Sequence, residues 1–372
     1  MRDASTLPLR LARVGAQRLT DATRLDPDPA AIARATCAAQ AQSYDAARHQ
    51  LRVRSTGLTA GAVDRAFEQE RSLARTWLMR GTLHLCAADD LRWMLDVLGP
   101  NSNRLGESRR VGLGLDDATC RRGVGVLRKT LAHGPVARRQ LRERLVAAGV
   151  IDEPVGQLLI HLLFHAATIG VICSGPRLRR DDSFVLLDDW VPASDGPRGK
   201  AALVELARRY LAAYGPASVA DFAAWSGLPS GLAKVGMAGI GTGMVAFPGA
   251  IPGLWTLGPV ASREPSSGPV VRLLGHFDTF LLGYRRREHV GDATAEAWIH
   301  QGGGGWIRPV VCVDGWIVGG WRLDSRGAVS EITVMPFVPL SARVEAGIEC
   351  EVVAISRFLE RPVRWTSGAL VG

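Results

Sequence analysis

The chain has 372 residues, of which 47% are hydrophobic and 22% are charged, a composition typical of a globular protein that excludes a disordered or fibrous chain. Residues 1–150 hold 25 Lys and Arg against 15 Asp and Glu, whereas residues 151–372 hold 20 against 21. The whole positive excess therefore lies in the N-terminal part, which favours a polyanionic partner, most often nucleic acid.

Targeting and redox features of the sequence predict a cytoplasmic location, close to the nucleoid. The first 25 residues carry five arginines but no apolar block long enough for a signal peptide. Residues 235–261 carry no charge, yet their seven glycines and three prolines argue against a membrane-spanning helix. The six cysteines include no C-x-x-C pair, so we expect buried free thiols and no zinc site.

The first part of the chain is predicted to form helices followed by a β segment. Asp28 before Pro29 is a helix start signal, and helices are expected over residues 30–41, 43–54 and 59–70. Residues 76–85 are rich in residue types that favour strands, and residues 91–98 are expected to be helical again. Helices followed by a short β segment are the outline of a winged helix.

Two amides one residue apart, Gln40 and Gln42, stand at the end of the first predicted helix. On a continuous helix, residues two apart point about 200° away from each other, so the pair shares a site only if the helix ends or bends there. Ser43 is a suitable N-cap for a second helix, which would place both amides at one helix–helix corner. The alternative is that one Gln caps a helix while the other is solvated.

A set of arginines follows the glutamine pair. Arg48 and Arg52 are spaced i and i+4, so they form a basic stripe on one helix face, and Arg54 lies close by. Such a stripe is either an ordinary solvated face or a set of phosphate contacts. The charge excess of the N-terminal part supports the second interpretation.

Two further segments repeat the outline of helices followed by a hairpin. In the second segment, helices are expected over residues 116–133, 136–148 and 154–168. In the third, they are expected over residues 200–213 and 218–225. Residues 171–173 and 183–187 are expected to form a hairpin between these segments. Gly-Pro breaks at 134–135 and 215–216 are 81 residues apart, which indicates a repeat of a domain-sized unit.

The C-terminal part is predicted to be mostly β. Residues 306–321 contain a strand, an Asp-Gly turn at Asp314 and Gly315, and a second strand. Residues 331–338 add a strand, and residues 342–359 a closing helix. We therefore expect an α+β fold of three tandem winged-helix (helix-turn-helix) units and a β-rich C-terminal domain. The expected boundaries are 1–110, 111–195, 196–265 and 266–372.

Three other signals predict no separate activity. His161 and His165 share a helix face, but no neighbouring Glu or third ligand accompanies them, so no metal is expected. The glycine run at residues 302–305 lacks the following Gly-Lys-Ser or Gly-Lys-Thr of a P-loop. Four tryptophans of the C-terminal part either pack in the core or line a drug pocket: Trp298, Trp306, Trp316 and Trp321.

Four segments together resemble the AlkZ-type winged-helix DNA glycosylases. They are Gln40-Ala41-Gln42, residues 71–85, residues 276–285, which begin His276-Phe277-Asp278, and Val313-Asp314-Gly315 with Gly320-Trp321-Arg322. The resemblance covers nearly the whole chain, with the segments in the expected order. It implies three winged helices and a β-rich domain that form a C shape around DNA.

The resemblance also implies roles for individual residues. Gln40 and Gln42 match the catalytic Gln-x-Gln motif, although Ser43-Tyr44 follows where the family carries an Asp-Pro-like pair. Contacts to DNA are expected from seven arginines: Arg48, Arg52, Arg54, Arg75, Arg80, Arg138 and Arg139. Substrate contact or structural support is expected from four residues: Thr82, His84, Asp278 and Arg285.

The implied reaction is excision of bulky N7-alkylguanines and unhooking of interstrand crosslinks, by a monomer on double-stranded DNA without a cofactor. Alkylation at N7 makes guanine cationic and therefore a good leaving group, so neutral amides suffice to place a water and to stabilise the sugar cation. A lyase needs an amine nucleophile. Because none of the three lysines (129, 200 and 234) is near the glutamines in sequence, we expect hydrolysis without strand cleavage.

Two other functions stay open at this point. Winged helices bind DNA more often than they catalyse reactions, so the chain is alternatively a regulator or a lesion sensor. It is also possible for the protein to sequester a toxic ligand, with the tryptophans as the pocket. If it is a glycosylase, it serves either general DNA repair or self-resistance to a DNA-alkylating natural product.

Overall fold

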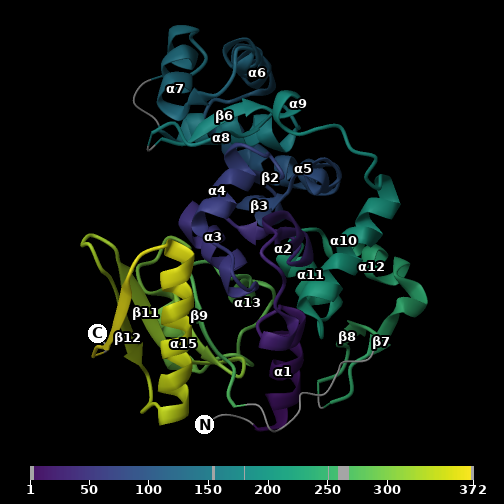
Figure 1. Ribbon diagram of the computed structural model, residues 1–372. Coiled ribbons are helices and arrows are strands. Elements are labelled where there is room, and N and C mark those ends of the chain that lie inside the picture. Colours follow the sequence, from purple (N-terminus) through teal and green to yellow (C-terminus); the bar gives the residue numbers. More distant parts are fainter. Residues whose placement is uncertain (1–3, 153–155, 180, 250, 259–267, 370–372) are drawn as a thin grey trace.

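The computed structural model describes residues 4–152, 156–179, 181–249, 251–258 and 268–369. Helices and strands are both abundant, which confirms the predicted α+β class. In Figure 1 the helices of residues 29–68 occupy the centre of the molecule, and the first helix, α1 (Leu7–Ala16), lies below them at its lower edge. The segment with α6, α7 and α8 lies at one end, the C-terminal sheet lies at the other, and α10–α12 lie to one side.

Four N-terminal helices precede the first hairpin. They are α1 (Leu7–Ala16), α2 (Pro29–Ala35), α3 (Tyr44–Val53) and α4 (Ala60–Glu68). The side chain of Asp28 accepts hydrogen bonds from two backbone N–H groups of α2. Ser43 caps α3 and Thr59 caps α4 in the same way, so all three predicted helix starts are confirmed.

The predicted helix over residues 30–41 is wrong at its C-terminal end. The helix α2 stops at Ala35, and Cys37 and Ala38 follow with positive φ angles of 52° and 76°. A left-handed backbone cannot continue a right-handed helix, so the chain turns here. It then enters a short strand, β1 (Ala39–Gln40), which carries the first glutamine.

A six-stranded sheet in the described part of the chain has the order β1-β3-β2-β5-β6-β4. The other strands are β2 (Leu73–Trp77), β3 (Leu83–Ala87), β4 (Val136–Ala137), β5 (Ile172–Ser174) and β6 (Ser183–Leu186). The strands β2 and β3 form a hairpin whose tip is the short helix η3 (Met79–Gly81). The predicted hairpin of β5 and β6 is confirmed.

One bridge, between Arg75 of β2 and Ser174 of β5, joins the first two predicted units into this single sheet. The units are therefore continuous in hydrogen bonding. Their winged-helix character and the boundaries 1–110 and 111–195 stay predictions.

The middle of the chain is mainly helical. The helices are α5 (Ala88–Gly112), α6 (Asp117–Leu131), α7 (Arg138–Ala147), α8 (Gly156–Thr168), α9 (Leu187–Trp190), α10 (Gly199–Tyr214), α11 (Val219–Ser226) and α12 (Ser230–Gly239). The helix α5 continues past Pro100, well beyond the predicted end at residue 98. It packs closely on α8, because a Cβ atom on Gly99 would lie 2.3 Å from the carbonyl oxygen of Thr168. The expected start of α8 at Pro154 lies outside the described residues.

The uncharged stretch before the C-terminal part forms the end of α12, a turn and the paired strands β7 (Met244–Ala246) and β8 (Trp255–Leu257). This agrees with the predicted strands and turns. Within the described residues, no helix is both long and apolar enough to cross a membrane.

A five-stranded sheet forms the C-terminal part, in the order β13-β12-β11-β10-β9. Its elements are β9 (Val271–Leu274), α13 (Thr279–Leu282), α14 (Ala293–His300), β10 (Val310–Val313), β11 (Trp316–Asp324), β12 (Ser330–Pro336), α15 (Ala342–Leu359) and β13 (Val363–Ser367). The turn at Asp314 and Gly315 and the helix over 342–359 are as predicted. Three of the four tryptophans are buried in this core, and Trp306 alone among them is exposed.

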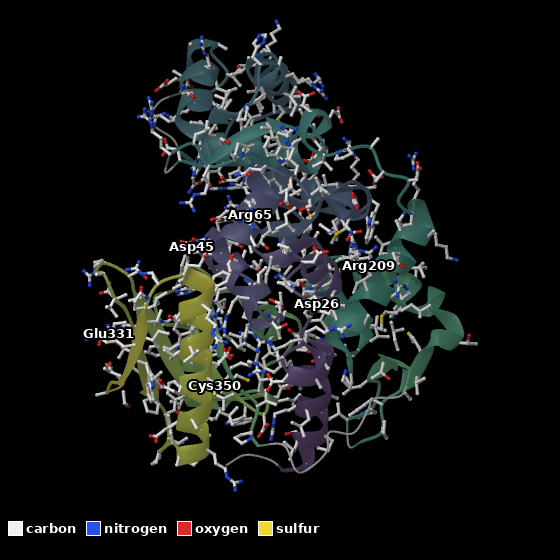
Figure 2. All side chains as sticks on the ribbon, in the orientation of Figure 1. Asp26, Asp45, Arg65, Arg209, Glu331 and Cys350 are labelled. Carbon is white, nitrogen blue, oxygen red and sulfur yellow. The ribbon has the colours of Figure 1, made fainter. Side chains whose placement is uncertain are left out.

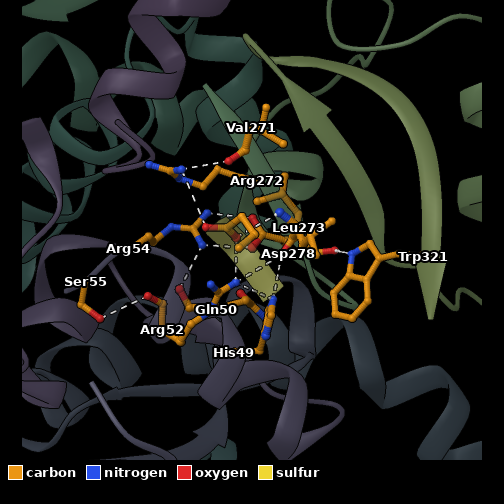
Figure 3. Close-up of polar contacts among 12 residues, drawn as sticks. His49, Gln50, Arg52, Arg54, Ser55, Val271, Arg272, Leu273, Asp278 and Trp321 are labelled. Carbon is orange, nitrogen blue, oxygen red and sulfur yellow. Dashed lines mark hydrogen bonds and ion pairs between the residues drawn. The ribbon is translucent and has the colours of Figure 1, made fainter. Parts of the chain in front are cut away.

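Two buried ion pairs attach α3 and the residue after it to the C-terminal part (Figure 3). Both terminal nitrogens of Arg54 donate to the carboxylate of Asp278, at 3.0 and 2.7 Å, and both side chains are about 1% exposed or less. Arg52 donates to Glu351 at 3.0 Å, again fully inside the molecule. Neither guanidinium is therefore accessible to a phosphate, and the structure gives both arginines an internal role.

Replacing Asp278 with Ala leaves the Arg54 guanidinium buried without its charge partner. We expect Asp278→Ala to lower the free energy of unfolding by about 3–5 kcal/mol in denaturant titrations, whereas Arg54→Met combined with Asp278→Leu restores most of it. Glu331→Gln is the control, because its partner Arg364 is 69% exposed. An equal denaturation midpoint for Asp278→Ala and Glu331→Gln would contradict this account.

Candidate active site and nucleic-acid interface

Gln40 is anchored inside the protein. It lies opposite His84 in the pairing of β1 with β3, and it is only 5% exposed. Its side chain accepts a hydrogen bond of 2.6 Å from Nη2 of Arg80. Because a guanidinium only donates, the amide atom that faces Arg80 is the oxygen. The backbone carbonyl of Gln40 is also engaged, by Nε2 of Gln50 at 2.9 Å.

Gln42 stands two residues further along and is exposed. Between the two glutamines, Ala41 continues the strand pairing with its N–H, which donates to the carbonyl of Leu83 at 2.6 Å. Residues two apart on an extended chain project toward the same side. The amides therefore stand at a corner between α2 and α3, as the sequence suggested, but an extended segment rather than a bent helix carries them.

An arginine-lined cleft of 590 Å³ opens beside Gln42, and we call it the Gln42 cleft. Its arginines come from β2, from α7 and from the loop after β5: Arg75, Arg138, Arg139, Arg142 and Arg177. Asp45, which Figure 2 labels, lines the cleft at the start of α3. A smaller hollow of 190 Å³, here called the inner hollow, also contains Gln42 and reaches Thr82 and Trp77.

Most of the exposed basic charge of the Gln42 cleft comes from α7, and Arg177 in the loop after β5 adds to it. Arg138 and Arg139 are both exposed at the start of α7, and Arg139 is 2.6 Å from Glu143 on the same helix. Arg142, one turn further on, was not singled out from the sequence, although its i+4 and i+3 spacing from the other two could have indicated it. Arg177 was also missed, because nothing local marks a loop residue as part of a cleft.

Two other arginines that were expected to contact DNA are already paired with carboxylates. Arg75 donates to the carbonyl of Ala41 at 3.1 Å and to Asp182 at 3.0 Å, so it holds the chain beside Gln42. Arg48 bonds to Asp45 at 2.5 Å and to Asp64 at 2.8 Å. These contacts leave little of their charge for a phosphate.

Arg80 lies at the tip of the first hairpin with a positive φ of 55°. It donates to Gln40 and, at 2.5 Å, to the backbone carbonyl of Trp225 in α11. Burial lowers the pKa of Arg80. The structure thus makes Arg80 a support for Gln40 rather than an exposed phosphate contact.

The four residues of uncertain role fall into two groups. Thr82 lines the inner hollow, and its carbonyl lies 2.8 Å from Nδ1 of His84. Burial, together with the nearby Arg80, lowers the pKa of His84 to about 3, so this imidazole is neutral at physiological pH. Asp278 is paired with Arg54, and Arg285 is exposed after α13, so neither lines the cleft or the hollow that contains Gln42.

Comparison with known proteins agrees with the resemblance seen in the sequence. A family model described as "DNA glycosylase AlkZ-like" matches residues 33–358. An interstrand DNA cross-link repair glycosylase of Streptomyces sahachiroi is 28% identical over 350 residues, which are 90% of this chain and 91% of that protein. The solved structure of Streptomyces sahachiroi DNA glycosylase AlkZ matches with a TM-score of 0.78 and 26% identity, over 98% of this chain and 100% of that one.

If the Gln42 cleft binds the DNA backbone, removal of one exposed arginine weakens binding through the loss of one phosphate contact. We expect Arg138→Ala to reduce duplex affinity. In fluorescence anisotropy titrations, we also expect the plot of log affinity against log salt to become less steep by about 1, because one phosphate contact is lost. Arg208→Ala is the matched control, since Arg208 is an exposed arginine on α10 that pairs with Glu205. Identical salt slopes for both variants would exclude Arg138 from the interface.

Proposed function

The chain belongs to the AlkZ-like DNA glycosylase family, and we propose that it hydrolyses the N-glycosidic bond of bulky N7-alkylguanines and unhooks interstrand crosslinks in double-stranded DNA. The observation that carries the proposal is the place of Gln42, an exposed neutral amide in an arginine-lined cleft. The printed name of the Streptomyces relative, a cross-link repair glycosylase, supports the substrate class.

In the proposed reaction the substrate is already activated, because the alkylated guanine is a good leaving group. When the C1′–N9 bond breaks, its electron pair moves onto the guanine and cancels the positive charge of the alkylated ring. The enzyme then has to stabilise the sugar cation and to supply a water whose oxygen bonds to C1′ and whose proton passes to solvent. The amide oxygen of Gln42 can accept a hydrogen bond from that water or direct its dipole at the cation.

The two glutamines have different proposed roles. The oxygen of Gln40 already accepts from Arg80 and the residue is only 5% exposed, so Gln40 has a supporting role. Among the described residues no hydrogen bond to the side chain of Gln42 is found, so its exposed amide oxygen is the one that we propose to act on the water and the sugar. Two of the three carboxylates that line the same cleft are less suited, because Asp182 faces Arg75 and Asp45 faces Arg48.

The lining of the site supports hydrolysis without strand cleavage. None of the three lysines lines the Gln42 cleft or the inner hollow. An amine nucleophile for a Schiff base is therefore absent from the described walls of the site. We propose that the protein acts as a monomer without a cofactor, in repair or in self-resistance.

The proposal predicts a specific loss on removal of the Gln42 amide. We expect the wild type to release N7-methylguanine from a duplex, and Gln42→Ala to reduce the single-turnover rate by about 10²–10³-fold at unchanged DNA affinity. Gln69→Ala is the control, because Gln69 is an exposed glutamine after α4 that lies outside the cleft. Chromatography of the freed base measures each rate.

Three outcomes of this assay distinguish the possibilities. Equal rates for Gln42→Ala and Gln69→Ala would remove the motif from the mechanism. Sequence-specific binding to undamaged DNA without base release would favour a regulator. A Gln40→Ala variant that retains most of the rate would agree with the proposal that Gln40 does not act on the water or the sugar itself.

The absence of lyase chemistry is tested separately by borohydride reduction during turnover. A glycosylase that uses only water gives no covalent enzyme–DNA adduct on a denaturing gel and leaves an intact abasic strand. A trapped adduct in the wild type would show that an amine of the protein attacks C1′. A known bifunctional glycosylase treated in parallel provides the positive control.

A further inference from the structure

A third hollow, of 500 Å³, opens beside the tip of the first hairpin, and we call it the side hollow. Its large apolar residues come from β2, α5 and α8: Trp77, Leu105, Ile160 and Phe164. Arg80, the support of Gln40, lies at its border. The side hollow lies outside the described walls of the Gln42 cleft and has no part in the mechanism proposed above.

The side hollow adjoins the inner hollow that contains Gln42. Trp77, Gly81 and Ile160 line both of them. A Cβ atom on Gly81 would lie 3.2 Å from the ring of Phe164, so the backbone at this shared border is held close to that ring. The two hollows therefore meet at Trp77, Gly81 and Ile160, and Ile160 is 42% exposed at this border.

The lining of the side hollow favours an uncharged, apolar ligand. Leu105 is 65% exposed and Ile160 is 42% exposed, although both are large apolar side chains. Trp77 is held in place, edge-on to Phe164 at 6.1 Å and stacked on Phe184 at 6.2 Å. No Asp or Glu is among the described lining residues. Apolar side chains on a rigid aromatic wall suit a hydrophobic or aromatic group better than a phosphate.

We propose that the side hollow binds the apolar or aromatic substituent carried on N7 of the alkylated guanine, while the guanine itself lies beside Gln42. This assignment rests on the proposed function and goes beyond it, because it makes the protein selective among N7 adducts. The substituent gains contact with Trp77 and Ile160, whereas a methyl group is too short to leave the inner hollow. Selectivity for bulky adducts then comes from this wall rather than from the glutamines.

The test compares two adducts in one duplex sequence, N7-benzylguanine and N7-methylguanine. We expect Ile160→Trp, which fills the shared border, to lower the single-turnover rate of benzylguanine release at least tenfold and to change methylguanine release less than twofold. Leu232→Trp is the matched control, since Leu232 is 44% exposed on α12 and lines neither hollow. Ile160→Ser is a second variant, which removes apolar wall without adding bulk and should reduce the preference for benzyl.

The outcomes separate this assignment from the proposed function. Equal losses on both adducts, or no loss on either, would overturn the side hollow as a substituent site. Weaker binding of Ile160→Trp to undamaged duplex would overturn it as well, because it would indicate stacking of an ordinary base. If the wild type releases neither base, the proposed function fails. The side hollow is then tested only by the affinity of the protein for the duplex that carries N7-benzylguanine. It then stands only if the wild type binds the benzyl duplex at least tenfold more tightly than Ile160→Trp does.

Discussion

The buried ion pair of Arg54 with Asp278 and the neighbouring pair of Arg52 with Glu351 attach α3 to the C-terminal part, at the start of α13 and at α15. A charged pair without access to water depends on further hydrogen bonds to its remaining donors, and Arg54 adds Gln17 and Thr279 to its partners, although its Nε has no partner among the described residues. Because α3 begins directly after Gln42, the same contacts set where the C-terminal part lies relative to the Gln42 cleft. The position of the Gln42 cleft therefore depends on residues that are buried inside the protein.

Arginine serves two purposes in this protein, and the sequence does not separate them. Arg52, Arg54, Arg75 and Arg80 each donate to carboxylates or carbonyls inside the fold, because a planar group with five N–H donors can join several acceptors at once. The exposed arginines that line the cleft lie instead on α7 and, with Arg177, in the loop after β5. Net charge identified the partner class correctly for this family, but it did not identify which arginines meet that partner.

Local chemistry made much of the fold predictable. Asp28, Ser43 and the turn at Asp314 were found because a cap or a turn depends on a few adjacent residues. The end of α2 was missed, because left-handed angles at two non-glycine residues are imposed by the surroundings. The glutamine motif itself was recognised, whereas its pairing with β3 and the anchoring of Gln40 by Arg80 depend on residues about 40 positions away.

The hydrogen bond from Arg80 to the oxygen of Gln40 makes the two amides of the motif non-equivalent toward acidic replacement. A carboxylate at position 40 would form an ion pair with that guanidinium. The guanidinium would neutralise its charge, so the carboxylate would add little negative potential in the cleft. A carboxylate at position 42 would meet water and the substrate directly, with no such cation bonded to it. One motif with a single alanine between its glutamines thus contains one position that is bonded to a buried guanidinium and one that is exposed in an arginine-lined cleft.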